Sequence, residues 1–297
     1  MIQKIVILGA GRIGKAIGRT LEINPGHQVE YWDANPIMVP DQKSLEQIIP
    51  MADFIFFCIP SQTINGACLS ISSLIKKQAV LGAFTKGIEL KTLKTIDQML
   101  CESLPDNPFA FFGGPMLAEE IENNLGGVAV VATDRKTFKK IKRLFSTTLI
   151  KLEYAKDIKA IAVASVLKNI YALSLGIADG LGWGTNIKGW LTAKAIKEMM
   201  MIAKILKINP KVILGSAGIG DFIATAFSPY SRNRASGEMI VKNGKCDTPG
   251  EGIISLPPLL DLLKNDTKKM PLLRTLTEVI INKKDAKEKF EELLKNY

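Results

Sequence analysis

The chain has 297 residues, of which 47% are hydrophobic, and a formal net charge of +10 from 39 lysines and arginines against 29 aspartates and glutamates. The hydrophobic content excludes a disordered chain, and the length exceeds what one compact core usually supports, so two domains are expected. The positive charge favours anionic ligands such as phosphorylated small molecules, although the lysines are scattered and most should form a solvated surface. Nucleic-acid binding is not expected, because the sequence contains no basic stripe interleaved with aromatic residues.

The first half of the chain alternates short apolar runs with helical or polar segments. Residues 4–9 form a β-branched run that leads into a glycine turn and then a helical pattern. Further apolar runs follow in "QVEYWDANP", "DFIFFCIPS", "AVLGAFTKG", "FAFFGGP", "GGVAVVAT" and "LIKLEYAKD". This rhythm is typical of a doubly wound α/β sheet, so a Rossmann-like dinucleotide-binding domain is predicted over residues 1–155.

The character of the sequence changes after residue 156. The β-branched runs give way to long segments rich in Ala, Leu, Ile and Met with a period near 3.6 residues. An all-helical substrate domain is therefore predicted over residues 156–297. Its helices are expected at 158–181, 190–207, 256–264, 271–281 and 284–296.

The most apolar of these segments contains Lys168, Asn169 and Asp179. Because these groups carry a heavy cost in a bilayer, a buried helix is predicted there and not a membrane span. Helical periodicity places Lys168 on a face with small and apolar residues, which are Ile161, Ala164, Ser165, Ala172 and Leu175. Such a face leaves room for a ligand, and a partly desolvated lysine is suited to proton transfer near neutral pH. A lysine that snorkels to the helix surface fits the same periodicity equally well.

A glycine motif follows the first predicted strand. Gly9, Gly11 and Gly14 form GxGxxG, whose glycines permit a tight turn, the approach of a pyrophosphate to a helix N-terminus and close packing of helix on strand. Asp33 ends the next strand, where a carboxylate accepts hydrogen bonds from the adenosine ribose and repels a 2′-phosphate; the alternative is a residue that only begins a turn. A dinucleotide site that prefers NAD is predicted, and Arg12, which could contact phosphate, leaves NADP open.

Two further segments carry polar groups in apolar surroundings. In residues 215–237, "GSAGIGDFIATAFSPYSRNRASG", Asp221 is followed by the polar residues 231–234 and then by a helix-like run. Arginine with hydroxyl and amide donors near a helix start favours a phosphate site, although a solvated turn is the alternative. Lys86, in "FTKGIE", follows an apolar strand at the carboxyl side of the sheet, where ligands of open α/β sheets bind.

The cysteine and histidine content limits the chemistry further. Cys58, Cys68, Cys101 and Cys246 lie far apart without a CxxC pair, and His27 is the single histidine. This pattern excludes a Cys/His zinc site, so no metal is expected, and it argues against a disulfide framework. A reducing cytoplasm fits best, and the apolar start of the chain lacks the cleavage site of a signal peptide.

Together these segments resemble the NAD(P)-dependent glycerol-3-phosphate dehydrogenase family over nearly the whole chain. "ILGAGRIG", "CIPSQ", "TKGIE", "GGPMLAEE", "VLKNIYALSLGIADGLGWGTN" and "GIGDFIATAFSPYSRNRASG" occur in the family order, and the last two are long and specific. The resemblance implies a cytoplasmic α/β enzyme, with an N-terminal Rossmann-like sheet and an all-α C-terminal substrate domain. Its implied reaction is reversible hydride transfer between NAD(P)H and dihydroxyacetone phosphate, giving sn-glycerol 3-phosphate for glycerophospholipid synthesis. A homodimer is left open.

The matching motifs imply roles for individual residues. Lys168 matches the family's catalytic lysine, which gives a proton to the ketone oxygen and removes it in the reverse direction. Asp221 matches an aspartate that holds the substrate and orients that lysine. Further implied contacts to the substrate come from Lys86, Gly114, Ser231, Arg232 and Asn233. Implied contacts to the cofactor come from Gly9, Gly11, Arg12, Ile13, Gly14, Asp33, Lys86, Ala118, Arg232 and Glu251.

Some positions depart from the family pattern. Ile13 stands where an aromatic residue is common, and Met116 stands where the family commonly has a serine. Residues 34–35 are Ala-Asn, where the family often carries an arginine suited to the 2′-phosphate, and this favours NAD. Because methionine cannot replace a hydroxyl hydrogen bond, a dehydrogenase of another small hydroxy acid or phosphorylated alcohol is one alternative. A nicotinamide-binding sensor without turnover is another, against which the matched lysine argues.

Overall fold

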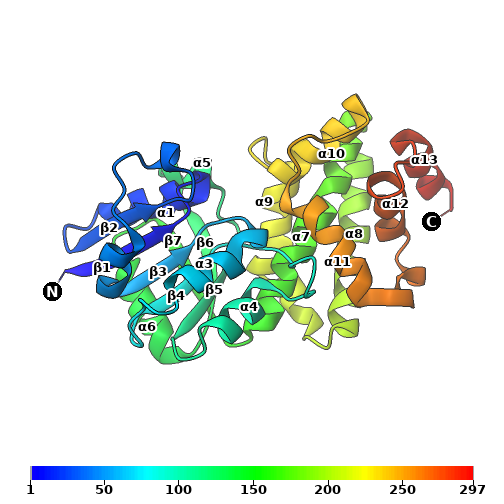
Figure 1. Ribbon diagram of the computed structural model, residues 1–297. Coiled ribbons are helices and arrows are strands. Elements are labelled where there is room, and N and C mark those ends of the chain that lie inside the picture. The colour runs from blue at the N-terminus through cyan, green and yellow to red at the C-terminus, as the bar shows by residue number, and fades with distance from the viewer. Residues whose placement is uncertain (1, 297) are drawn as a thin grey trace. The chain divides into compact units, whose positions relative to one another are not determined.

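A computed structural model describes residues 2–296 of the chain (Figure 1). Packing divides the chain into two compact units, Met1–Lys86 with Lys94–Ala162, and Gly87–Leu93 with Val163–Tyr297. The first unit holds the sheet and the second is helical, which confirms the predicted fold class. The domain boundary expected after residue 155 stays a prediction.

The first unit is built on a sheet that has seven strands within the described residues, in the order β2-β1-β3-β4-β5-β6-β7. All neighbouring strands run parallel except β5 and β6. Each apolar run identified in the sequence forms one strand, and the strands are β1 (Gln3–Leu8), β2 (His27–Trp32), β3 (Phe54–Phe57), β4 (Val80–Ala83), β5 (Phe109–Gly113), β6 (Gly127–Ala132) and β7 (Ile150–Ala155).

Both faces of this sheet are covered. Phe54 and Phe56 of β3 belong to a core cluster shared with β1, α1 (Arg12–Glu22) and α6 (Arg135–Leu144). Ile55 and Phe57 point to the opposite face because side chains alternate along a strand. All four side chains are buried, as expected for a parallel sheet with helices on both sides. Other helices of this unit are α2 (Leu45–Ile48), α3 (Ile64–Ile71), α4 (Ile96–Ser103) and α5 (Ala118–Glu122).

The carboxyl edge of the sheet carries the loops that hold the predicted site residues of this unit. β1 leads into the glycine loop, β4 leads to Lys86, and β5 leads to Gly114. Because β1, β3, β4 and β5 run parallel in that order, these loops leave the same edge.

The second unit is helical, with its principal elements at α7 (Ile158–Gly180), α8 (Thr185–Ile205), α9 (Asp221–Phe227), α10 (Arg232–Asn243), α11 (Glu251–Leu263), α12 (Pro271–Ile280) and α13 (Ala286–Asn296). α11 begins before the predicted start at residue 256 although Pro257 and Pro258 lie inside it. Pro258 and its neighbours Leu256 and Leu259 are buried, so packing outweighs the hydrogen bonds that the prolines cannot make.

The long apolar helix α7 is a core helix. By length and composition it could span a membrane, but its apolar stretch is wholly buried, which confirms the predicted buried helix. On α7, the Tyr171 hydroxyl donates a 2.8 Å hydrogen bond to Glu198 of α8, which also accepts the N–H groups of Leu272 and Leu273 at the start of α12. Burial raises the pKa of Glu198, and these donors oppose that shift only in part.

α7 and α10 pack backbone against backbone. A Cβ atom on Gly176 of α7 would lie 1.9 Å from the carbonyl oxygen of Arg234, and one on Gly237 of α10 would lie 2.2 Å from that of Leu173. Neither distance is sterically possible, so both positions require glycine. This crossing sets the position of α10, whose first turn carries residues 231–234 of the predicted phosphate site.

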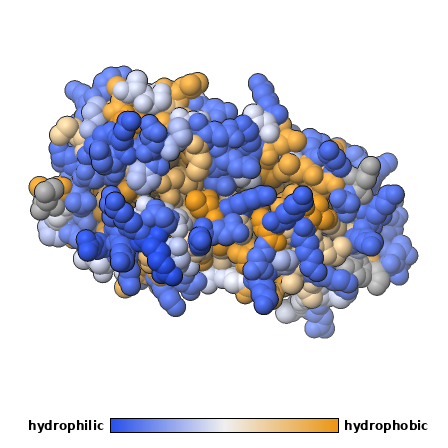
Figure 2. All heavy atoms as spheres, turned by 90° about the horizontal axis from the view of Figure 1, so that it is seen from below, coloured by the Kyte–Doolittle hydropathy of each residue, from blue (hydrophilic) through white to orange (hydrophobic). Residues whose placement is uncertain are grey.

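The surface is mostly polar, and α6 carries a concentration of positive charge. Hydrophilic side chains are spread over the face shown in Figure 2, with apolar ones between them. α6 departs from the scattered distribution of lysines expected from the sequence, because it contains no acidic residue and its cationic side chains are all exposed: Arg135, Lys136, Lys139, Lys140, Lys142 and Arg143.

The helix crossing predicts unequal effects of two glycine substitutions. Gly237→Ala should lower the free energy of unfolding by about 1–3 kcal/mol, because the new methyl group displaces α7. Gly189→Ala, on an exposed turn of α8 where a Cβ meets nothing within 4 Å, should instead raise it by about 0.5–1 kcal/mol. Urea unfolding followed by circular dichroism measures both, and equal effects would contradict the described crossing.

Candidate active site

The glycine loop has the geometry that a dinucleotide requires. Gly9 has a φ of +101°, and a Cβ there would lie 2.7 Å from the carbonyl oxygen of Cys58, while a Cβ on Gly14 would lie 1.9 Å from the oxygen of Gly9. A Cβ on Gly11 would meet nothing within 4 Å, so the space before the helix is open. Gly11 caps α1 without a side-chain hydrogen bond, and the first N–H groups of this helix can receive a pyrophosphate.

Asp33 lies against this loop. Its Oδ2 atom accepts a 2.8 Å hydrogen bond from the N–H of Ala10, and its Oδ1 atom accepts one of 2.9 Å from Asn35. The side chain of Gln42 pairs with the backbone N–H and C=O of Asp33 at 2.7 and 2.9 Å. Each carboxylate oxygen keeps a further lone pair, so the residues present fit an adenosine ribose at this position.

Other predicted cofactor contacts of this unit lie near the loop. Arg12 forms an ion pair with Glu119 in the first turn of α5, which Ala118 begins. This pair is half exposed, so it contributes little to stability and a phosphate could compete for the guanidinium. Ile13 is half-buried and packs against the core cluster, so an aliphatic side chain serves there.

Lys86 and Gly114 come together at the ends of neighbouring strands. The Nζ atom of Lys86 donates a 3.3 Å hydrogen bond to the carbonyl oxygen of Gly114. Gly114 has a φ of +101°, and a Cβ there would lie 2.5 Å from the oxygen of Val128, so only glycine fits. Met116 packs against the same core cluster as Ile13, so a thioether fills the position where the family pattern has a hydroxyl.

In the second unit, Lys168 is buried in an ionic hydrogen-bond network. Its Nζ atom donates to Asp221 Oδ1 at 2.9 Å and to Thr225 Oγ1 at 2.6 Å, and Thr225 Oγ1 lies 3.3 Å from Asp221 Oδ1. The side chains of Lys168 and Asp221 are 8% and 3% exposed. The lysine therefore does not snorkel, and its ammonium group is held in one direction by two oxygens.

The chain before α9 places Asp221. Residues 216–220 form a π-helical turn, and a Cβ on Gly218 would lie 2.2 Å from the oxygen of Ile213, so the turn is closely packed. Asp221 is the first residue of α9, and Thr225 lies four residues later on the same helical face. Sequence reasoning missed Thr225, although this spacing from Asp221 is a signal that could have found it.

The predicted phosphate segment opens α10. Ser231 is the N-cap, and its Oγ atom accepts the N–H of Arg234 at 3.2 Å. Arg232 is exposed and has no ion pair or side-chain hydrogen bond to another described residue. Arg234 donates to Asp179 Oδ2 at 2.6 Å, and Lys188 donates to Asp179 Oδ1 at 2.9 Å, so this cluster joins α10 to α7 and α8.

Asn233 is held in a network that sequence reasoning also missed. Its Nδ2 atom donates to Asn169 Oδ1 at 2.8 Å, and its Oδ1 atom accepts the N–H of Gly252 at 2.8 Å. A Cβ on Gly252 would lie 2.3 Å from the carbonyl oxygen of Asn169, so α11 approaches α7 closely here. Glu251, the first residue of α11, lies beside this contact in the sequence. Asn233 therefore uses one amide hydrogen and one lone pair of its amide oxygen to position the helices.

The predicted site residues thus form two groups, one in each unit. The first unit carries Gly9, Gly11, Arg12, Ile13, Gly14, Asp33, Lys86, Gly114 and Ala118, and the second carries Lys168, Asp221, Ser231, Arg232, Asn233 and Glu251. No cluster of three or more His, Cys, Asp or Glu side chains suited to a metal ion occurs among the described residues.

Comparisons with known proteins match both units. A family model described as the C-terminus of NAD-dependent glycerol-3-phosphate dehydrogenase matches residues 157–291, and one described as its N-terminus matches residues 35–139. A glycerol-3-phosphate dehydrogenase [NAD(P)+] of Clostridium acetobutylicum is 29% identical over 98% of this chain and 96% of its own length. A glycerol-3-phosphate dehydrogenase [NAD(P)+] of Clostridium botulinum is 32% identical over 84% of this chain and 78% of its own length.

Solved structures show the same fold. A glycerol-3-phosphate dehydrogenase of Coxiella burnetii, 22% identical, covers 99% of both chains with a TM-score of 0.90. The corresponding protein of Plasmodium falciparum, 21% identical, covers 100% of this chain and 96% of its own with a TM-score of 0.84.

Removal of the partner of the buried ammonium should be costly. Asp221→Asn should lower the free energy of unfolding by about 3 kcal/mol, because it removes the negative charge that the buried ammonium of Lys168 contacts. The double variant Lys168→Met/Asp221→Asn should regain part of this loss. Asp247→Asn, whose partner Lys245 is exposed, is the matched control and should change little in urea unfolding. A loss in Asp221→Asn no larger than in the control would contradict a buried ion pair.

Proposed function

This chain belongs to the NAD-dependent glycerol-3-phosphate dehydrogenase family, and from that premise we propose that it interconverts dihydroxyacetone phosphate and sn-glycerol 3-phosphate with a nicotinamide cofactor. The observation that carries the proposal is the buried ammonium of Lys168, held by Asp221 and Thr225. The curated relatives carry the name glycerol-3-phosphate dehydrogenase [NAD(P)+] over nearly the full chain. The product would serve glycerophospholipid synthesis.

Lys168 is proposed as the proton donor and acceptor. A nicotinamide cofactor, when bound, would supply or take up the hydride at C2. Reduction places negative charge on the ketone oxygen, and an ammonium fixed in direction can stabilise that charge and transfer its proton. In the reverse direction the neutral amine removes the proton of the C2 hydroxyl. Asp221 and Thr225 fix the position of Lys168 Nζ by accepting its hydrogen bonds. The negative charge of Asp221 also favours return of the proton to the lysine nitrogen.

The start of α10 is proposed to hold the phosphate of the substrate. Arg232 offers a guanidinium that pairs with no described residue, at the first position of a 12-residue helix. A guanidinium at a helix N-terminus suits a phosphate through charge and through its paired donors. Asn233 has one amide hydrogen left for the substrate, and Ser231 acts as the N-cap that shapes this turn. Lys86 and Gly114 are also proposed to contact the substrate, as the resemblance implies. Lys86 and Glu251 are proposed to contact the cofactor on the same ground.

NAD is proposed as the preferred cofactor, with NADP as the alternative. Asp33 would accept a ribose hydroxyl and repel a 2′-phosphate, and Arg12, which could attract one, is paired with Glu119. A related ketone is a second candidate substrate, because Met116 is partly buried against the core cluster and offers no hydroxyl. Turnover of a panel of hydroxy-acid and phosphorylated ketones separates the two substrates.

The cytoplasm is the proposed location, because all four cysteines are free thiols. Burial raises the pKa of the Cys68 thiol to about 11, so this group is protonated and unreactive. A homodimer is proposed because Ile223, Phe227 and Tyr230 form exposed apolar surface at and after α9. A mass of one chain in light scattering would refute the dimer.

The reaction is tested with dihydroxyacetone phosphate and NADH or NADPH, by following absorbance of the reduced cofactor. We expect turnover by the native chain and a fall of about 10³-fold or more in kcat for Lys168→Met, because the proton donor is lost. Bound NADH, measured by fluorescence, should remain, and Lys204→Met on the exposed end of α8 should behave as the native chain. No turnover with either cofactor would reject the proposal.

Cofactor preference should respond to the charge of Asp33. Asp33→Asn keeps an acceptor for the N–H of Ala10 but removes the negative charge that opposes a 2′-phosphate. We expect the ratio of kcat/KM for NADPH over that for NADH to rise about tenfold. An unchanged ratio would show that this carboxylate does not face the ribose.

A further inference from the structure

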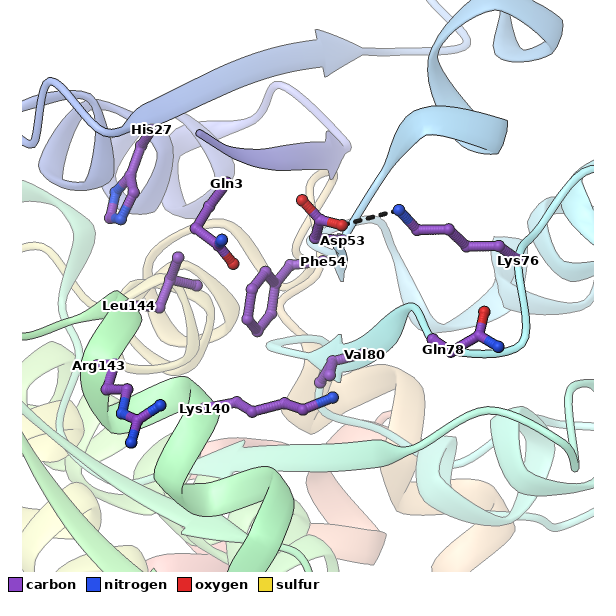
Figure 3. Close-up of a pocket in the computed structure, with 10 residues that line it drawn as sticks. All are labelled: Gln3, His27, Asp53, Phe54, Lys76, Gln78, Val80, Lys140, Arg143 and Leu144. Atoms are coloured by element: carbon purple, nitrogen blue, oxygen red, sulfur yellow. Dashed lines mark hydrogen bonds and ion pairs between the residues drawn. The ribbon is translucent and has the colours of Figure 1, made fainter. Parts of the chain in front are cut away.

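A cavity of about 520 Å³ opens at the amino-terminal edge of the sheet (Figure 3). Its wall includes the first residues of neighbouring strands, His27 of β2, Gln3 of β1, Phe54 of β3 and Val80 of β4. The glycine loop lies at the other end of β1, roughly 20 Å away at about 3.3 Å per residue. The cavity is therefore separate from the proposed dinucleotide site.

Positive charge surrounds this cavity. α6 contributes Lys140 and Arg143, and the chain before β4 contributes Lys76. Figure 3 shows these side chains around Phe54, with the amide of Gln3 turned toward the centre. Lys140 and Arg143 are exposed, and among the described residues neither forms an ion pair. Their charges are thus free to act on a ligand.

The acidic side chain of the lining is already neutralised. Asp53 Oδ1 accepts a 2.7 Å hydrogen bond from Lys76 Nζ, and Asp53 Oδ2 accepts one of 2.9 Å from the N–H of Lys4. Burial acts to raise the pKa of Asp53, but these two donors outweigh it and hold the pKa below its usual range. Asp53 is the single carboxylate among the described lining residues, so Lys140 and Arg143 leave a net positive field.

We propose that this cavity is a second anion-binding site, which takes a small ligand bearing a phosphate group. Its volume suits a small molecule. The guanidinium of Arg143 matches a phosphate through paired donors, and Lys140 adds a point charge from the next turn of the same helix. Gln3 and Gln78 supply amide donors, and Phe54, Val80 and Leu144 form an apolar wall for the carbon part of the ligand.

The imidazole of His27 can report ligand binding in this cavity by NMR. It is the single histidine of the chain and lies in the cavity wall, with Nδ1 2.9 Å from the carbonyl oxygen of Leu21. We titrate the full chain with inorganic phosphate at constant ionic strength and follow the imidazole signals by NMR. A saturable shift is expected, because an anion beside Lys140 and Arg143 changes the field at the ring. No saturable shift would overturn the proposal for a free phosphate.

A pair of matched variants locates the binding. Lys140→Ala/Arg143→Ala should weaken the apparent affinity about tenfold or more, since it removes two charge-assisted contacts. Lys136→Ala/Lys139→Ala removes the same charge from exposed positions of the same helix that do not line the cavity, and should change it less than about twofold. An equal loss of phosphate affinity in both double variants would show that only the net charge of α6 matters, and it would overturn the proposal of a specific site in the cavity.

The source of the phosphate is distinguished by a second arm. Vesicles of phosphatidylglycerol in phosphatidylcholine are added in place of inorganic phosphate, and co-sedimentation is measured for the same variants. Binding of vesicles alone, lost in Lys140→Ala/Arg143→Ala and kept in the control, would assign the site to a lipid headgroup. Failure of both probes would overturn the proposal. Turnover of dihydroxyacetone phosphate should be equal in both variants, which separates this outcome from a failure of the proposed function.

Discussion

A buried positive charge is the constraint to which the helical unit is fitted. The ammonium of Lys168 lies in the core, where an unpaired charge would greatly destabilise the folded state. The fold must therefore place oxygen acceptors beside it. Asp221 and Thr225 supply them from one face of α9. The π-helical turn over residues 216–220 lets that helix begin at the aspartate. The apolar length of α7 is then understandable as the packing around the polar networks that this helix carries.

Much of the fold was visible in the sequence because its signals are local. Most strands are short runs of aliphatic and aromatic residues bounded by glycine and polar residues, and a buried parallel strand needs no alternation to be recognised. The helical half follows from periodicity. Predictions failed where packing overrides local preference: α11 begins at Glu251 and not at residue 256, and α9 forms in a segment that glycines interrupt.

The site was predictable in its residue types but not in its pairings. Lys168 and Asp221 were identified, and the spacing of Thr225 from Asp221 on α9 could have identified it as well. The network of Asn169, Asn233 and Gly252 was missed because hydrogen bonds between positions 19 and 64 residues apart leave no periodic trace. The engagement of Arg12 with Glu119 was hidden for the same reason. Asn233 illustrates the difference, because its amide holds α7, α10 and α11 together through two hydrogen bonds that the sequence does not reveal. The predicted roles of these residues keep the status of proposals.

The contact of α7 with α10 restricts how the ligand specificity of this protein can change. With Gly176 and Gly237 in backbone contact, α10 has no room to move closer to α7. New specificity must therefore arise by exchange of side chains at the tip of the helix, such as Arg232, while the helix itself stays fixed. A directed-evolution library that randomises the two glycines would contain mostly destabilised chains, whereas one confined to the tip would sample altered recognition on an intact scaffold.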